Sequence, residues 1–156
     1  MTQTAAALST DARTEIVEAL NQSVAETAVT TMLAQNFHWN VTGMAFGPLH
    51  DLFQKIYEDH FVAQDDLAER IKALDAHAEG TLAGMLKRSK IAEHDGHASD
   101  RDMIKAMKDA QETLAATLAG AGATAAQHAD TLTEDLCIAR GQTHEKFAWF
   151  LRSHLA

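Results

Sequence analysis

Two histidines and two carboxylates on neighbouring predicted helices could bind a metal ion. His38 lies at the end of one apolar-periodic segment and His50 opens the next, with glycines and a proline marking a turn between them. We therefore expect the two imidazoles to meet across a short hairpin. Asp65 and Glu69 are four residues apart, which places both carboxylates on one face of a helix. Two nitrogens and two carboxylates suit a borderline divalent metal such as iron or zinc.

The spacing of these four ligands requires two subunits if one ion uses them all. Asp65 follows His50 by fifteen residues on one predicted helix, so their Cα atoms lie roughly 22 Å apart at 1.5 Å rise per residue. Two side chains on one ion allow roughly 13 Å between their Cα atoms, since each bonds at about 2 Å. We expect a symmetric dimer contact in which the histidines of one subunit face the carboxylates of the other. The alternative is two ordinary packed histidines and a solvated acidic face.

The composition indicates a soluble globular protein with one domain. The chain has 156 residues, 46% hydrophobic and 22% charged, which allows a sizeable core. Its net charge of −9 disfavours wrapping nucleic acid by bulk charge and favours attraction of cations. The single Cys137 excludes an intrachain disulfide and is expected to be buried on a late helix. We see no membrane span and no secretory signal, so we expect a cytoplasmic location.

The sequence predicts a short tail followed by one helical domain. Residues 1–10 have no Lys or Arg and are expected to form a flexible N-terminal tail, and residues 11–156 the domain. The first long helix has an apolar stripe in steps of three and four, and it delivers His38 at its C-terminal end. N-caps for this helix are available at Ser9, Thr10 and Asp11.

Three more long helices are predicted by apolar stripes of the same period. The second helix carries His60 on its buried seam, where we favour a satisfied core histidine over a metal ligand. The third begins at Ser99, which forms a capping box with Asp102, and is expected to loosen at Gly120 and Gly122. The stripe of the fourth helix consists of Leu132, Leu136, Ala139, Thr143, Phe147, Phe150 and Leu151.

A long crossover is expected between the second and third long helices. The apolar pattern breaks over residues 75–98, where a patch around Met85 predicts a small helix. A possible metal tract within the crossover consists of Glu93, His94, Asp95 and His97. We favour a solvated loop there, because nothing orients these ligands. Together the elements predict an all-α, ferritin-like four-helix bundle with a short helix in the long middle crossover.

These motifs, taken together, resemble one family. The run HWNVTG at residues 38–43 is followed by His50, and then by D-x-x-A-E-R at residues 65–70. The combination resembles the Dps family, the ferritin-related "DNA-binding proteins from starved cells". The similarity extends from the first helix to the closing KFAWFLRS segment at residues 146–153. The combined spacing is specific, whereas any one piece of it would be weak.

The resemblance implies a hollow dodecamer that oxidises Fe(II), preferably with hydrogen peroxide, stores the ferric product and protects against oxidative stress. Members bind iron at two-fold interfaces, which implies His38 and His50 as ligands from one subunit and Asp65 and Glu69 as ligands from the other. Trp39 resembles a tryptophan near this site in the family and could quench a stray oxidising equivalent. Packing of Trp39 at the dimer contact is an equally good interpretation.

One position departs from the pattern of the family. Four residues after His50, where the family commonly has a carboxylate, this sequence has Gln54. A carboxamide oxygen is a neutral and weaker ligand, so the second iron position is expected to lose a negative charge. Glu58, another turn along the same face, could compensate, either through water or by binding a shifted ion.

Pores for iron entry are a further implication of the resemblance, which places them at the start of the fourth helix. The acids available there are Asp130, Glu134 and Asp135. Rings of carboxylates would focus cations inward. We favour the simpler interpretation, in which these acids complement the dipole of the helix.

Two other functional classes remain open. The tail has no basic residue and Arg152 is the only one after Lys146, so we expect DNA binding to be weak or absent at physiological salt. In the second class, zinc closes the dimer site as a structural metal and no redox chemistry follows.

Overall fold

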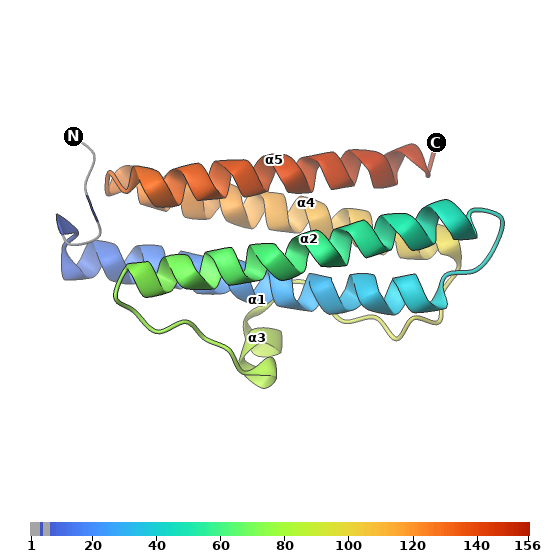
Figure 1. Ribbon diagram of the computed structural model, residues 1–156, viewed down its shortest axis with the longest axis horizontal. Coiled ribbons are helices and arrows are strands. Elements are labelled where there is room, and N and C mark those ends of the chain that lie inside the picture. Colours follow the sequence, from blue (N-terminus) through green and yellow to red (C-terminus); the bar gives the residue numbers. More distant parts are fainter. Residues whose placement is uncertain (1–3, 5–6) are drawn as a thin grey trace.

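Four long helices lie alongside one another, and a short fifth helix lies outside them (Figure 1). The computed structural model describes residue 4 and residues 7–156, and no strand occurs in this part of the chain. The elements are α1 (Thr10–Asn40), α2 (Phe46–Ala73), α3 (Leu82–Arg88), α4 (Asp100–Gln127) and α5 (Thr131–Ser153). The predicted four-helix bundle with a short helix in its crossover is confirmed.

The lengths of the connections set the directions of the helices. Residues 41–45 make a tight turn, so α1 and α2 run antiparallel. Residues 74–99 cross back along the bundle and carry α3, which packs on α1 (Figure 1). As a result α2 and α4 run in the same direction, and α5 returns antiparallel to α4. One long crossover of this kind is typical of ferritin-like bundles.

The first helix begins at one of its predicted caps. Ser9 is the N-cap of α1, and its Oγ accepts a hydrogen bond from the backbone N–H of Ala12 at 3.2 Å. Leu8, just before the cap, is 6% exposed and packs in the apolar cluster that contains Ile16. Residues 1–3 and 5–6 of the expected tail lie outside the described residues, so the division into tail and domain stays a prediction.

Two glycines near the end of α4 do not loosen the helix, which is contrary to the prediction. The helix continues through Gly120 and Gly122 to Gln127. A Cβ atom added to Gly122 would lie 3.3 Å from the Cβ of Cys137 on α5, so this glycine permits a close approach of the two helices. Cys137 is buried and unpaired, as expected, and burial together with the nearby charge of Asp130 raises the pKa of its thiol to about 11.

The buried face of α5 also differs from the predicted stripe. Its buried residues are Thr133, Cys137, His144, Ala148 and Leu151. Leu132, which the stripe included, is 59% exposed, and Ala139 is exposed as well. Ile138 and Trp149 are also more than half exposed. Apolar residues therefore occupy more than one face of this helix, and their spacing alone could not identify the face that packs on the core.

The core consists of two apolar clusters separated along the bundle by a polar layer. One cluster surrounds Phe37 and Phe53, near the turn between α1 and α2. The other surrounds Leu20 and Leu67, towards the opposite end. The side chains of the polar layer come from α2, α4 and α5, and they are Asp59, His60, Gln111, Arg140 and His144.

The five polar side chains form a closed ring of hydrogen bonds. Arg140 donates to both carboxylate oxygens of Asp59, at 3.2 and 2.6 Å, and to Nε2 of His144 at 3.4 Å. Nδ1 of His144 donates to Oε1 of Gln111 at 2.8 Å. Nε2 of Gln111 donates to Nε2 of His60 at 2.9 Å, and Nδ1 of His60 donates to Asp59 at 3.0 Å. Since arginine can only donate and an ionised carboxylate can only accept, the direction of the whole ring is determined.

Burial and charge keep both imidazoles of the ring neutral. Burial, reinforced by the neighbouring His60 and Arg140, lowers the pKa of His144 to about 2. Burial also lowers the pKa of His60, although its hydrogen bond to Asp59 opposes the shift. For Asp59, burial would raise the pKa, but hydrogen bonds from His60 and Arg140 outweigh it and hold the pKa well below its usual range. His60 is thus the satisfied core histidine that the sequence favoured.

None of the helices in the described part of the chain is both long enough and apolar enough to cross a membrane.

Candidate metal centre

His38 and His50 meet across the turn between α1 and α2, as predicted. Their ring centroids are 3.7 Å apart and the rings are stacked with an interplanar angle of 20°. Nδ1 of His38 donates to the backbone oxygen of His50, and Nδ1 of His50 donates to the backbone oxygen of His38, both at 2.8 Å. Because a carbonyl oxygen can only accept, each Nδ1 carries its hydrogen and each Nε2 keeps a free lone pair. The reciprocal bonds therefore leave one nitrogen of each ring able to bind a metal ion.

The ends of the two helices explain why these bonds form. His38 lies in the last turn of α1, where backbone carbonyls lack a partner within the helix. His50 lies in the first turns of α2, directly across the connection, and its ring satisfies the carbonyl of His38. The imidazole of His50 thus supplies a hydrogen-bond donor to an unpaired carbonyl at the end of α1, and the same bond fixes the orientation of its ring.

Two aromatic side chains support the histidine pair. Tyr57 stands edge-on to His38, with centroids 5.3 Å apart and an interplanar angle of 79°. Phe46 packs against His50 at 5.1 Å. Sequence reasoning did not assign either residue to the site. Tyr57 follows His50 by seven residues, two helical turns along one face, and this spacing was the signal that could have identified it.

Asp65 and Glu69 lie apart from the histidines. Both are exposed on α2, which is continuous from Phe46 to Ala73, so Asp65 stays roughly 22 Å from His50 along the helix. Neither carboxylate has a hydrogen-bond or ion-pair partner within the described residues. Among those residues, no three His, Cys, Asp or Glu side chains are placed to hold a metal ion together. Within one subunit the two histidines and the two carboxylates are therefore separate groups.

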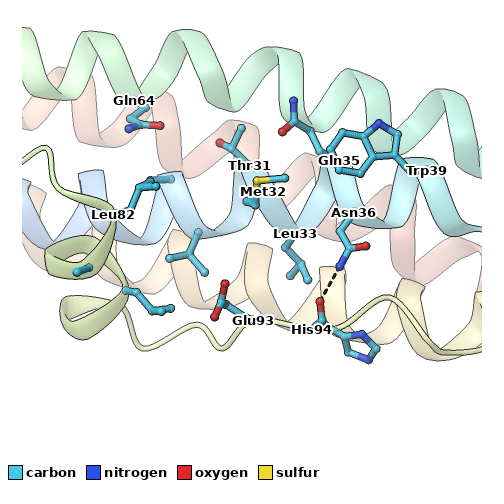
Figure 2. A pocket seen from close by; sticks show the side chains of 14 residues that line it. Thr31, Met32, Leu33, Gln35, Asn36, Trp39, Gln64, Leu82, Glu93 and His94 are labelled. Carbon is cyan, nitrogen blue, oxygen red and sulfur yellow. Dashed lines mark hydrogen bonds between the residues drawn. The ribbon is translucent and has the colours of Figure 1, made fainter.

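Trp39 is 63% exposed and lies on the outer side of α1. It lines an open pocket of about 550 Å³ between α1, α3 and the crossover. Figure 2 shows Trp39 and Gln35 close together on the same face of α1. Gln64 of α2, the neighbour of Asp65, also lines this pocket. Trp39 thus belongs to the surface that the pocket opens onto and not to the core.

The pocket belongs to a surface with several large exposed apolar side chains. Met32, Leu82 and Leu86 line it and are 48%, 84% and 43% exposed. Phe61 and Val62 of α2, near Gln64 in the sequence, are 71% and 59% exposed. Large exposed apolar patches are typical of protein interfaces.

Gln54 and Glu58 extend the face of α2 that begins at His50. Nε2 of Gln54 donates to Oε1 of Glu58 at 2.8 Å. Gln54 is half-buried and Glu58 is exposed. The second carboxylate oxygen of Glu58 has no partner in the part of the chain that the structure describes.

Asp130 is a helix cap and not a pore residue. It is 1% exposed, and it accepts a hydrogen bond from the backbone N–H of Thr133 at 3.1 Å. It also forms an ion pair with Arg70 at 2.8 Å. The arginine of the D-x-x-A-E-R motif therefore ties α2 to the start of α5. Of the acids considered for a pore, only Glu134 and Asp135 remain accessible.

The histidine-rich tract of the crossover is a loop, as predicted, but it is not wholly solvated, because His94 is half-buried and held in place. The ring of His94 packs edge-on against Phe37 at 5.2 Å. Its backbone oxygen accepts a hydrogen bond from Asn36 at 2.6 Å (Figure 2), and its Nδ1 accepts one from the backbone of Gly96 at 3.0 Å. Glu93, also in the tract, is exposed. His94 thus fastens the crossover to α1.

Comparison with known proteins agrees with this architecture. The chain matches the family model described as "Ferritin-like domain" over residues 17–156, so its class is that of ferritin-like proteins. It is 31% identical to "DNA protection during starvation protein 2" of Bacillus anthracis over 141 residues, which cover 90% of this chain and 97% of that one. It is 30% identical to "General stress protein 20U" of Bacillus subtilis over the same shares of the two chains.

Solved structures give the same result. A Dps protein from Bacillus brevis superposes with a TM-score of 0.92 at 30% identity, covering 96% of this chain and 100% of that one. A DPS protein from Vibrio cholerae O1, described as a member of a superfamily of ferritin-like diiron-carboxylate proteins, gives a TM-score of 0.91 at 30% identity, covering 96% and 94%. The chain belongs to the Dps family.

Proposed function

We propose that the protein is a subunit of an iron-storage cage that oxidises Fe(II) at sites shared between two subunits. The observation that carries the proposal is the His38–His50 pair, whose Nδ1 atoms are held by backbone carbonyls while both Nε2 atoms are free. Neutral imidazoles with one free nitrogen suit Fe(II), a borderline metal. The iron is the substrate and the cargo, and the ferric product is stored inside the cage.

The missing acidic ligands come from a second copy of the chain. Asp65 and Glu69 are exposed and have no partner among the described residues, and they are too far along α2 to reach the ion at their own His50. A two-fold axis with antiparallel α2 helices brings the carboxylates of each subunit to the histidines of the other. The exposed apolar residues on α1, α2 and α3 support this contact, because they would be buried in it.

The chemistry follows from the ligand set. The carboxylates supply the negative charge that favours Fe(III) over Fe(II), and the imidazoles keep the site open to an oxidant. Two Fe(II) ions give one electron each to one hydrogen peroxide, which takes up two protons and leaves as two water molecules. Because the electrons are delivered as a pair, no hydroxyl radical is released. Trp39, which is exposed beside His38 in the sequence, donates an electron in this proposal if only one iron is present.

Several finer points belong to the same proposal. The cage has twelve subunits and lies in the cytoplasm, and its role is protection against oxidative stress, which agrees with the relatives named for DNA protection during starvation. DNA itself is bound weakly or not at all, because the net charge is −9. Zinc can occupy the site as a substitute. A site that held only structural zinc would bind metal without oxidising Fe(II).

A complementation experiment tests the shared site. One variant lacks the histidines (His38→Ala with His50→Ala), and the other lacks the acids (Asp65→Asn with Glu69→Gln). Each alone should fail to oxidise Fe(II) with peroxide. After the two are unfolded and refolded together, half of the dimers are mixed and each has one intact site, so about a quarter of the wild-type activity should return.

Two measurements accompany the activity. The wild-type protein, titrated with Fe(II) without oxygen and then given peroxide, should consume two irons per peroxide. Native mass spectrometry should show that the refolded mixture contains mixed assemblies. If mixed assemblies form and no activity returns, the site is not shared. If the wild-type protein binds Fe(II) without oxidising it, the structural-metal alternative holds instead.

A further inference from the structure

Gln54 and Glu58 follow His50 by one and two further turns of α2. The steps of four residues keep all three side chains on one side of the helix. The Cα atom of Glu58 is about 12 Å from that of His50 at 1.5 Å rise per residue. This separation lies within the roughly 13 Å that two ligands of one ion allow, so it is also short enough for ligands of two neighbouring ions. Glu58 is therefore the first carboxylate on this face that can reach a second ion beside the histidine pair.

The hydrogen bond between Gln54 and Glu58 orients the carboxylate of Glu58 and leaves one of its oxygens unbonded. Gln54 uses its amide nitrogen to hold Oε1 of Glu58 at 2.8 Å, which leaves Oε2 without a partner among the described residues. Lys55, one turn before Glu58, does not form an ion pair with it in that part of the chain, and neither does any other described Lys or Arg. The negative charge of Glu58 is thus not neutralised within its own subunit.

In the proposed dimer, the carboxylate of Glu58 lies close to the two-fold axis. If Glu69 of the partner subunit meets His50 across antiparallel helices, the two-fold axis passes midway between the two positions, close to Glu58. Along α2 from the histidine pair towards the two-fold axis, the first side chain on this face is Gln54 and the second is Glu58. Both side chains face the space between the two equivalent iron positions.

The geometry points to Glu58 as the anionic ligand of a second iron position, with Gln54 as the residue that positions it. The inference rests on the proposed function and states how this chain completes the site. With glutamine at position 54, its amide donates to Glu58 and avoids the repulsion that two carboxylates one turn apart would create. The charge of the second position has in effect moved one turn along α2.

Binding of Co(II), a redox-inert stand-in for Fe(II), tests the inference without relying on turnover. Metal-free wild-type protein is titrated without oxygen and followed by calorimetry and by the visible absorption of Co(II). We expect two ions per subunit with different affinities. Glu58→Gln should keep the hydrogen bond from Gln54 but weaken the second affinity by about 10- to 100-fold, with the first unchanged. Restoring a carboxylate in the double variant Gln54→Glu, Glu58→Gln should recover the second affinity.

Two control variants separate the possible failures. Asp66→Asn removes an exposed charge from the same helix, and it should leave both affinities as in the wild type. His38→Ala should abolish the tighter binding. Two unchanged affinities in Glu58→Gln would overturn the inference alone, and so would a single ion per subunit in the wild type. Unchanged binding in His38→Ala would overturn the proposed function and the inference together.

Discussion

The chain contains two histidine pairs whose nitrogen atoms are satisfied in opposite ways. His38 and His50 are half-buried, and each donates from Nδ1 to a backbone carbonyl while its Nε2 stays free. His60 and His144 are fully buried, and all four of their nitrogens take part in hydrogen bonds with other side chains. The ring centroids of the two pairs are 3.7 and 4.8 Å apart.

Two imidazoles that lie close together do not by themselves make a metal site. In the buried pair, Arg140 donates to His144 and neutralises Asp59, so the place that a cation could take is already filled by a guanidinium. In the outer pair, the partners of Nδ1 are backbone carbonyls, which carry no formal charge and leave Nε2 unopposed. A free nitrogen, and not the residue type alone, is what allows a histidine to bind a metal ion.

Arg140→Met should have the largest effect, because it breaks the buried ring. Asp59 would lose its bidentate partner and stay largely buried as a charge, which should lower the free energy of unfolding by about 3–5 kcal/mol. Urea unfolding at one fixed protein concentration measures the loss. Arg152→Met, which removes an arginine that is 62% exposed, is the control and should cost less than about 1 kcal/mol. Equal losses in the two variants would contradict the role of the ring.

Acid should weaken the fold through the same ring. Above about pH 6.5 the histidines are neutral in both the folded and the unfolded state, so they give the free energy of unfolding no pH dependence there. Below it the unfolded chain takes up protons that His60 and His144 cannot accept in the fold, because their pKa values are lowered, so stability falls as pH falls. The slope should be about 1.4 kcal/mol per pH unit for each of the two histidines.

Unfolding of metal-free protein between pH 7.5 and 4.5 tests this sign and slope. His144→Gln cannot titrate, so its stability should depend less steeply on pH, by about 1.4 kcal/mol per unit. A wild-type slope in His144→Gln would mean that the ring does not exclude protons.

His38→Ala should lose activity and keep most of its stability, which is the reverse of what we expect for the buried histidines. The rate of Fe(II) oxidation with peroxide should fall at least about tenfold, because an oriented ligand is lost. The free energy of unfolding should change by only about 1 kcal/mol, since one hydrogen bond to a carbonyl is removed. His60→Ala should instead lose stability. If His38→Ala lowered the free energy of unfolding as much as His60→Ala does, the proposed difference between the two histidine pairs would be wrong.

The smallest effect is expected for Tyr57→Leu. Its ring stands edge-on to His38 and makes no hydrogen bond that the site requires. Loss of such an aromatic contact is worth about 0.5–1.5 kcal/mol, so metal affinity should weaken by about two- to tenfold. Calorimetry with Co(II) measures it, and Tyr57→Phe should bind as the wild type does. An unchanged affinity in Tyr57→Leu would show that the carbonyl bonds alone orient the pair.

Much of the fold could be predicted from local patterns. Ser9, the Ser99–Asp102 capping box and the cap at Asp130 all mark helix starts in the structure, because capping depends on residues three positions apart. The crossover helix around Met85 and the meeting of His38 and His50 across a short turn were predicted for the same reason. The prediction failed on α5, where apolar residues occupy several faces and only packing selects one.

The sequence by itself determined the helices, their long crossover and the spacing that keeps Asp65 away from its own His50, since these depend on helical rise and period. Only the tertiary structure decided which histidine nitrogens are free. The bonds of the buried ring that connect different helices join residues 33, 51 and 81 positions apart, and no periodicity reports on such pairs. The backbone carbonyls that orient His38 and His50 cannot be recognised in the sequence, because every residue has a backbone carbonyl.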